Sequence, residues 1–229
     1  MKAGLAEYAS TRVFDRYHDV RRAQEIAEQF SALSHTGFED VTKKMSLRRD
    51  NKGSSIAEAL IECFLEDYGY AKFPYVAARD NKNPNTSQNG ADLMGFFRPQ
   101  NSVYFLFGEV KFSGETKYPP TVVTKPGELM TQLQSINSDA EQRDNLIQWF
   151  AQKVSGTDHW SDYLQAYELY YRDETKIKII GALVRTVRPN SRDIVGIFEQ
   201  IVCNIRSEYF EMVAIYVDKK DMMLAGGGN

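Results

Sequence analysis

The stretch 103-VYFLFGEVKFSGETK-117 begins with aromatic and aliphatic residues and then places a glutamate and a lysine two positions apart. Alternate side chains of a β-strand share a face, so Phe107, Glu109 and Lys111 lie on one face. Both faces are apolar in the first half of the stretch, which is typical of a strand buried on both sides. We therefore expect a central strand over 102–112 whose charged residues emerge at its carboxyl end.

The residues upstream of this strand predict a helix and a hairpin partner. An apolar stripe at helical spacing runs through 54-SSIAEALIECFLEDYG-69, with serine at its start and glycine at its end. A polar loop covers 80–90, and 91-ADLMGFF-97 has the pattern of a strand. A turn at 98–101 joins that strand to the central one, so the two are expected to pair antiparallel.

The residues downstream predict further alternation of helices and strands. After a linker rich in proline and glycine, we expect helices at about 128–153, 160–172 and 191–208, and strands at 176–187 and 210–217. A mixed sheet flanked by helices is an α/β fold. Residues 1–50, with a helix at about 11–33, are expected to form an N-terminal helical extension. Residues 51–225 are expected to form one domain that ends in C-terminal α/β elements.

Composition limits the class of protein. The chain has 229 residues, is 42% hydrophobic and carries a formal net charge of −3, so its overall charge does not attract nucleic acid. Local basic patches or a partner would have to supply phosphate contacts. The two cysteines lack the spacing of a zinc site or a disulfide framework. No signal peptide or membrane-length apolar run is present, so we expect a soluble, cytoplasmic protein without membrane contact.

Charged residues on the hairpin predict a metal site. Asp92 begins the strand before the central one, and antiparallel pairing brings it beside Glu109. Buried charges must be paired or bound to a metal. Two carboxylates and the Val110 carbonyl suit Mg²⁺ or Mn²⁺, and Lys111 beside them can orient or activate a water molecule. The alternative is an ion pair at a strand end, and the second pair, Glu115 and Lys117, has that simpler explanation because it lies past the strand.

This pattern resembles the PD-(D/E)XK nuclease superfamily over about residues 50 to 150. The resemblance rests on Asp92 in 90-GADLMGF-96 and on Glu109 and Lys111 in 108-GEVKF-112, with Ala91 in place of the proline that names the motif. It implies a restriction-endonuclease-like core and Mg²⁺-dependent hydrolysis of DNA phosphodiester bonds. A restriction or repair endonuclease, a phosphohydrolase of small nucleotides and a catalytically silent scaffold subunit of a DNA-processing complex are the alternatives.

The resemblance also implies roles for residues outside the hairpin. Superfamily members often carry a metal-binding glutamate on the preceding helix, for which Glu58 is the first candidate and Glu62 the second. A polar residue on the following helix assists the site in some members, and Gln132 or Gln134 would hold that place. Several basic residues could contact DNA phosphates; the alternative is that they lie in exposed loops. They are Lys43, Lys44, Arg48, Arg49, Lys52, Lys117 and Lys125, and the same two alternatives apply to Arg185 and Arg188.

The layout of the chain is also similar to the HamA family, the nuclease subunit of the Hachiman anti-phage defence system. The similarity lies in the motifs GADLMGF and FGEVKF, the helix after them and a long mixed C-terminal half. It implies a helicase partner that restrains the nuclease until DNA is engaged. No Gly-rich phosphate loop is present in the chain, which fits a subunit without a motor of its own.

Overall fold

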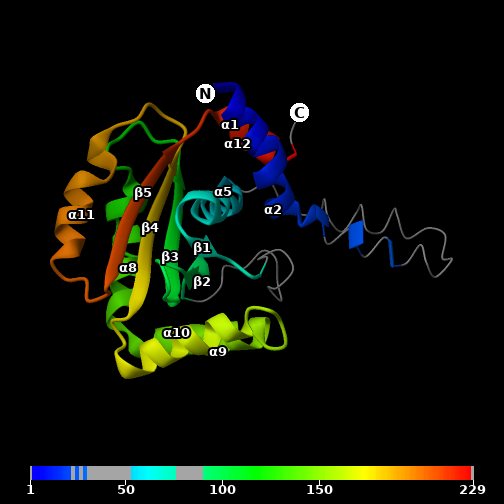
Figure 1. Ribbon diagram of the computed structural model, residues 1–229. Helices are drawn as coiled ribbons and strands as arrows, with labels where there is room; N and C mark the ends of the chain where they lie inside the picture. Colours follow the sequence, from blue (N-terminus) through cyan, green and yellow to red (C-terminus); the bar gives the residue numbers. More distant parts are fainter. Residues whose placement is uncertain (1, 22–23, 26–27, 30–52, 76–89, 228–229) are drawn as a thin grey trace.

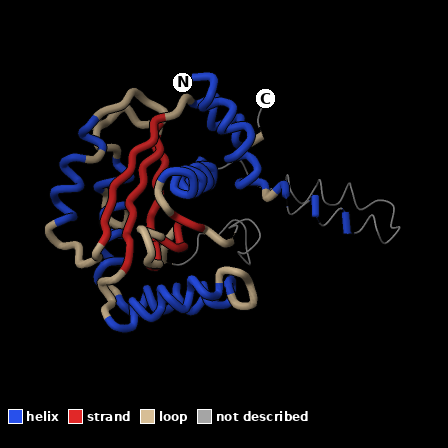
Figure 2. Tube along the Cα trace, in the orientation of Figure 1, coloured by secondary structure: helices blue, strands red, loops and turns tan. Residues whose placement is uncertain are grey.

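The computed structural model describes residues 2–21, 24–25, 28–29, 53–75 and 90–227. These residues form a five-stranded sheet in the order β1-β2-β3-β4-β5, with helices on both faces (Figures 1 and 2). The first three strands pair antiparallel, and β3, β4 and β5 pair parallel. The predicted α/β fold with a mixed sheet is therefore confirmed. The strands are β1 (Ala71–Lys72), β2 (Leu93–Phe97), β3 (Tyr104–Ser113), β4 (Ile177–Arg185) and β5 (Tyr209–Tyr216).

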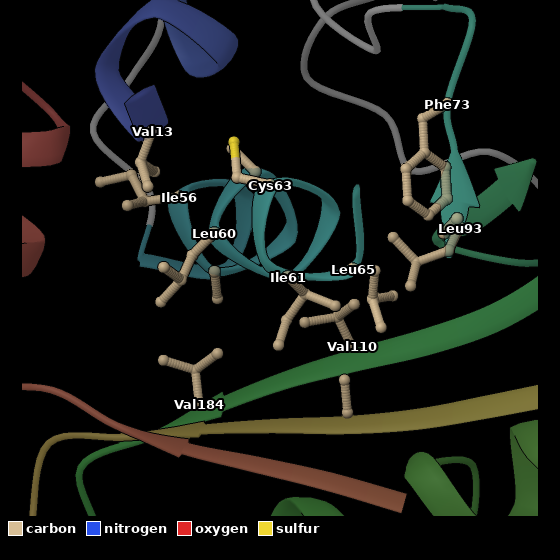
Figure 3. Packing of buried hydrophobic residues seen from close by; sticks show 14 of the residues in the cluster. Val13, Ile56, Leu60, Ile61, Cys63, Leu65, Phe73, Leu93, Val110 and Val184 are labelled. Atoms are coloured by element: carbon tan, nitrogen blue, oxygen red, sulfur yellow. The ribbon is translucent and has the colours of Figure 1, made fainter. Parts of the chain in front are cut away.

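Strand β3 is central, and its alternating side chains enter two separate cores. Leu106 and Val110 face one core, which also contains Val184 of β4 and is covered by α5 (Figure 3). Phe105 and Phe107 face the other core, beneath α8, α9 and α10. Burial on both faces explains why the first half of β3 is apolar throughout.

The helices divide between these two faces. One face carries the N-terminal helices, α5 and the C-terminal helix α12, and Figure 1 shows both chain ends on that side. The other face carries α7 to α10 and also α11, whose Ile197 and Ile201 belong to the same core. The bounds are α1 (Lys2–Tyr8), a π-helical turn (Ala9–Val13), α2 (Phe14–His18), α5 (Gly53–Tyr68), α7 (Thr121–Thr124), α8 (Leu129–Ser138), α9 (Ala140–Val154), α10 (Trp160–Arg172), α11 (Val195–Val202) and α12 (Lys219–Ala225).

Three predicted helices differ from the structure. The one expected at about 11–33 is interrupted, because a π-helical turn (Ala9–Val13) leads into α2, which ends at His18 where Asp19 adopts a left-handed backbone conformation. The helix expected over 128–153 is two helices, because Asp139 leaves the helical conformation and its side chain accepts a hydrogen bond from Gln142 N at 3.0 Å, capping α9. The helix expected over 191–208 is a 3₁₀ turn, Ser191–Asp193, followed by α11, which ends at Val202. Within the described residues, no helix combines the length and apolar character needed to cross a bilayer.

Candidate active site

The hairpin of β2 and β3 brings Asp92 beside Glu109. Leu93 pairs with Gly108 across the two strands, so the residue before Leu93 lies alongside the residue after Gly108. Asp92 is held there by its Oδ2, which accepts a hydrogen bond from the backbone N–H of Val110 at 2.9 Å. The carboxylate is thus fixed to the backbone of β3 at the point where the side chain of Glu109 leaves that strand.

Glu109 is a buried acid, with 3% of its surface exposed. Burial and the negative charge of Asp92 raise the pKa of its carboxyl to about 8, although the nearby Lys111 acts to lower it. The Nζ of Lys111 donates to Glu109 Oε1 at 2.7 Å. Two acidic groups and one ammonium therefore share this site, and ionising both acids would leave one negative charge without a counterion.

Lys111 keeps its positive charge in this site. Burial alone would lower its pKa, but the hydrogen bond to Glu109 and the charges of Glu109, Asp92 and Glu128 outweigh that effect and raise it. A charged ammonium donates hydrogen bonds and stabilises anions, whereas a general base must be neutral. The surroundings of Lys111 therefore suit orienting a water molecule or holding a phosphate oxygen, and not removing a proton.

Glu128 is a site residue that sequence analysis missed. Its Oε2 lies 3.8 Å from Lys111 Nζ, and it immediately precedes α8. An acidic residue at this position is ordinarily explained by the positive end of the helix dipole. The only signal in the sequence was its place at the start of the helix that follows the Glu-x-Lys strand.

The oxygen donors at this site fit a hard divalent cation. Asp92 and Glu109 supply two carboxylates, and Val110 brings backbone next to both. Magnesium is commonly held by one or two carboxylates, with water and substrate phosphate completing its shell. Among the described residues no group of three or more His, Cys, Asp or Glu side chains is arranged to hold a metal. The described part of the chain thus offers two acidic ligands here and no third.

The two glutamates of α5 differ in what surrounds them. Glu62 is buried, and its Oε2 accepts from Arg16 Nε at 2.6 Å, so its carboxylate already forms an ion pair within the fold. Glu58 is partly buried; burial is the main cause of the raised pKa of Tyr75, and the charges of Glu62 and, least of all, Glu58 add to it. Helix α5 covers the Val110 face of the sheet, whereas Glu109 shares the face of Phe107. The structure does not bring either glutamate into a three-carboxylate cluster with the hairpin.

A network around Arg16 connects α2 to the strand that follows Asp92. The guanidinium of Arg16 donates to the carbonyl of Tyr75 at 2.9 Å and to the carbonyl of Phe73 at 3.3 Å. The hydroxyl oxygen of the buried Tyr75 accepts from Met94 N at 3.1 Å. This network fixes the start of β2 from the side opposite to β3, and so it positions the Asp92 backbone.

Among the described residues, the remaining predicted ones make no hydrogen bond or ion pair with Asp92, Glu109 or Lys111. Lys117 and Lys125 are exposed, as is Gln134. Gln132 lies one turn after Glu128, and its buried Oε1 meets no hydrogen-bond donor among the described residues. The basic residues Lys43, Lys44, Arg48, Arg49 and Lys52 lie outside the described residues.

Arg185 does not contact solvent, so the idea that it touches DNA phosphate is wrong. It is fully buried, and its Nε lies 3.1 Å from Asp193 Oδ2. Its remaining nitrogens donate to the carbonyls of Ser113 at 3.3 Å and Lys117 at 2.9 Å. Arg185 thereby holds the chain that leaves β3, while Arg188 is exposed.

The second Glu-x-Lys pair is outside the site. Glu115 is exposed, and its carboxylate accepts from the N–H and hydroxyl of Thr121 at 3.0 and 2.9 Å. These hydrogen bonds lower the pKa of Glu115. Glu115 therefore organises the turn into α7. The candidate catalytic pair is Glu109 and Lys111 at the end of β3.

Comparison with known proteins identifies the family. The HamA family model matches residues 2–222, which is nearly the whole chain. No curated protein matches the sequence. The match spans the hairpin with Asp92, Glu109 and Lys111 as well as the helices on both faces of the sheet. The chain therefore belongs to the HamA family, whose members are components of the Hachiman anti-phage defence system.

Proposed function

We propose that this Hachiman component is a metal-dependent nuclease that hydrolyses DNA phosphodiester bonds. The observation that carries the proposal is the pair of carboxyl groups of the half-buried Asp92 and the buried Glu109, with the ammonium of Lys111 bonded to Glu109. A secluded acid pair without a full counterion has little structural benefit, because burying like charges costs stability. Such a pair is suited to binding a cation that a phosphate diester also contacts.

The order of elements supports the same proposal. Helix α5 is followed by the antiparallel strands β1, β2 and β3, then by α8 and by β4 parallel to β3. This is the order of helix, Asp strand, Glu-x-Lys strand and helix that the resemblance to PD-(D/E)XK nucleases implies. We therefore propose a restriction-endonuclease-like core for the part of the chain from α5 to β4.

Each residue of the hairpin has a distinct role in this proposal. Asp92, Glu109 and the Val110 carbonyl would hold Mg²⁺ or Mn²⁺, which when bound polarises a phosphate and acidifies water. Lys111, kept charged by its surroundings, would stabilise negative charge on the phosphate oxygens. Glu128 helps to hold Lys111 in place and charged. Glu58 would act on the site only indirectly, through water or through Tyr75.

Family membership supports a partner for this activity. Hachiman is a defence system with a helicase, and the described residues contain no motor. The chain has a net charge of −3, so capture of DNA by the helicase would compensate for weak binding by this chain on its own.

The test is cleavage of plasmid and linear DNA, with an RNA of matched sequence, in Mg²⁺, Mn²⁺ or EDTA and with or without the helicase partner. We expect metal-dependent cleavage that Glu109→Ala and Lys111→Ala both abolish and Glu115→Ala leaves intact. Glu58→Gln and Glu62→Gln, measured in parallel, assign the role of α5. Cleavage that survives both Glu109→Ala and Lys111→Ala contradicts the proposed site. An intact complex with the helicase that cuts nothing indicates a scaffold role.

A further inference from the structure

Helix α10 carries a ladder of aromatic rings that runs from the core into solvent. Trp160 stacks on Tyr163 at 5.0 Å between ring centroids, Tyr163 on Tyr167 at 6.0 Å, and Tyr167 on Tyr171 at 6.3 Å. The inner rungs pack toward β3, since the ring of Tyr163 lies 5.4 Å from that of Phe105. At the outer end, Tyr167 is 44% exposed and Tyr171 is 80% exposed. Aromatic surface left in water in this way is typical of protein interfaces.

The outer rungs of the ladder border a groove between α9 and α10, which lie side by side at one end of the sheet (Figure 1). The groove has a volume of about 470 Å³. Besides Tyr167 and Tyr171, it is lined by Asp144, Gln148 and Glu174. We call this feature the tyrosine groove. Its size matches that of pockets that take a few side chains of a ligand.

The charge of the tyrosine groove is negative. Asp144 and Glu174 line it, and none of its lining residues is lysine or arginine. Arg143 is buried behind the groove, where it donates to Glu174 and to the carbonyls of Ile136 and Asn137. The faces of the tyrosine rings add negative potential. A phosphate backbone would be repelled here, whereas a cationic side chain would be attracted.

We propose that the tyrosine groove docks a protein segment that bears arginine or lysine, supplied by the helicase partner. A guanidinium or ammonium group would lie over the ring of Tyr171 or Tyr167 and pair with Asp144 and Glu174. Tyrosine is among the residues that contribute most to binding energy at interfaces, because it buries a large area at low entropic cost. This inference rests on the helicase partnership in the proposed function and not on nuclease activity.

Gln148 provides a direct test of the sign of the partner's charge. It is exposed, lines the groove and makes no described hydrogen bond. Gln148→Lys adds a positive charge to the groove and Gln148→Glu adds a negative one, with little change in size. If the groove binds a cationic segment, Gln148→Lys should weaken binding and Gln148→Glu should strengthen it. If it binds single-stranded DNA, the opposite is expected.

The experiment is biolayer interferometry of the purified helicase on the immobilised full-length chain, at two salt concentrations. We expect the double variant Tyr167→Ala/Tyr171→Ala to lose at least about tenfold in affinity, as removal of central aromatic residues does at other interfaces. Gln148→Lys should weaken binding and Gln148→Glu should strengthen it, both effects shrinking at high salt. Tyr68→Ala is the matched control, because Tyr68 is 70% exposed on α5, and it should leave the affinity unchanged.

Several results would overturn the proposal. Failure of the wild-type chain to bind the helicase would remove the assigned occupant, as would equal affinity of the wild type and the tyrosine double variant. A gain in affinity on Gln148→Lys, or loss of single-stranded DNA binding by the tyrosine variants alone, would identify a nucleic acid instead. Dimerisation that the tyrosine variants abolish would identify a second copy of the chain. None of these results depends on whether the chain cleaves DNA, so the two proposals fail separately.

Discussion

Replacing Glu109 with glutamine is expected to stabilise the protein at high pH while abolishing the nuclease activity proposed above. Burial and the charge of Asp92 raise the pKa of the Glu109 carboxyl from 4.5 to about 8. Between these two values the folded chain keeps a proton that the unfolded chain has released, so the free energy of unfolding falls as the pH rises. Glutamine has no proton to lose, and its amide oxygen can still accept from Lys111.

The size of the effect follows from that pKa. One unit corresponds to about 1.4 kcal/mol, so the shift sets an upper bound of about 4–5 kcal/mol on the cost of ionising Glu109 in the folded state. That pKa already includes the hydrogen bond to Lys111, and relaxation of the buried site reduces the bound to roughly half. We expect a net gain of about 2–3 kcal/mol at about pH 9, where wild-type Glu109 is mostly ionised, and close to none at about pH 4.5.

The assay is thermal unfolding of the metal-free protein, followed by circular dichroism from about pH 4.5 to about pH 9. For a chain of this size the gain corresponds to a rise in Tm of about 4–10 °C at the upper end of that range. The matched control is Glu115→Gln, which changes the exposed glutamate of the second Glu-x-Lys pair. Its difference from wild type should remain small throughout. If Glu109→Gln is no more stable than wild type at about pH 9, the reasoning from burial and the Asp92 charge is refuted.

Three further perturbations test the surroundings of the site. Arg16→Ala removes the ion-pair partner Arg16 from the buried Glu62 and should cost about 3–5 kcal/mol in urea unfolding, with Arg16→Lys costing less; equal stability would show that the pair contributes nothing. Tyr75→Phe removes the acceptor for Met94 N and should cost about 1–3 kcal/mol; it should also slow cleavage, and full activity would argue against the network positioning β2. Mg²⁺ at millimolar concentration should raise the Tm of the wild type and not that of Asp92→Asn, and an equal rise in both would place the cation elsewhere.

The hairpin could be predicted from sequence because its determinants are local. The turn at 98–101, the apolar run and the two-residue period of a strand together place Asp92 beside Glu109. The break at Asp139 was also readable, since aspartate followed three residues later by glutamine is a helix-start signal within the predicted helix. It was missed because the apolar positions keep nearly the same spacing on both sides of the break.

The other differences depend on contacts between distant parts of the chain. Glu62 is engaged by Arg16 from a different helix, and nothing within α5 distinguishes it from Glu58. Arg185 is buried because the chain leaving β3 folds back over it, which strand periodicity does not reveal. Glu128 reaches Lys111 only because a linker rich in proline and glycine returns α8 to the end of β3.

The topology of the sheet also has a consequence for the order in which the protein folds. The β2–β3 hairpin closes a short loop, whereas β3 meets β4 only after α7, α8, α9 and α10 have been placed, and β4 meets β5 only after α11. Short loops close orders of magnitude faster than long-range parallel pairings form. We therefore expect Asp92 and Glu109 to meet while both are still hydrated, and their repulsion to grow only as the later helices exclude water. In the nascent chain, a divalent cation bound between the two carboxyl groups at that stage, as the proposed function requires, would offset their repulsion and speed the last steps of folding.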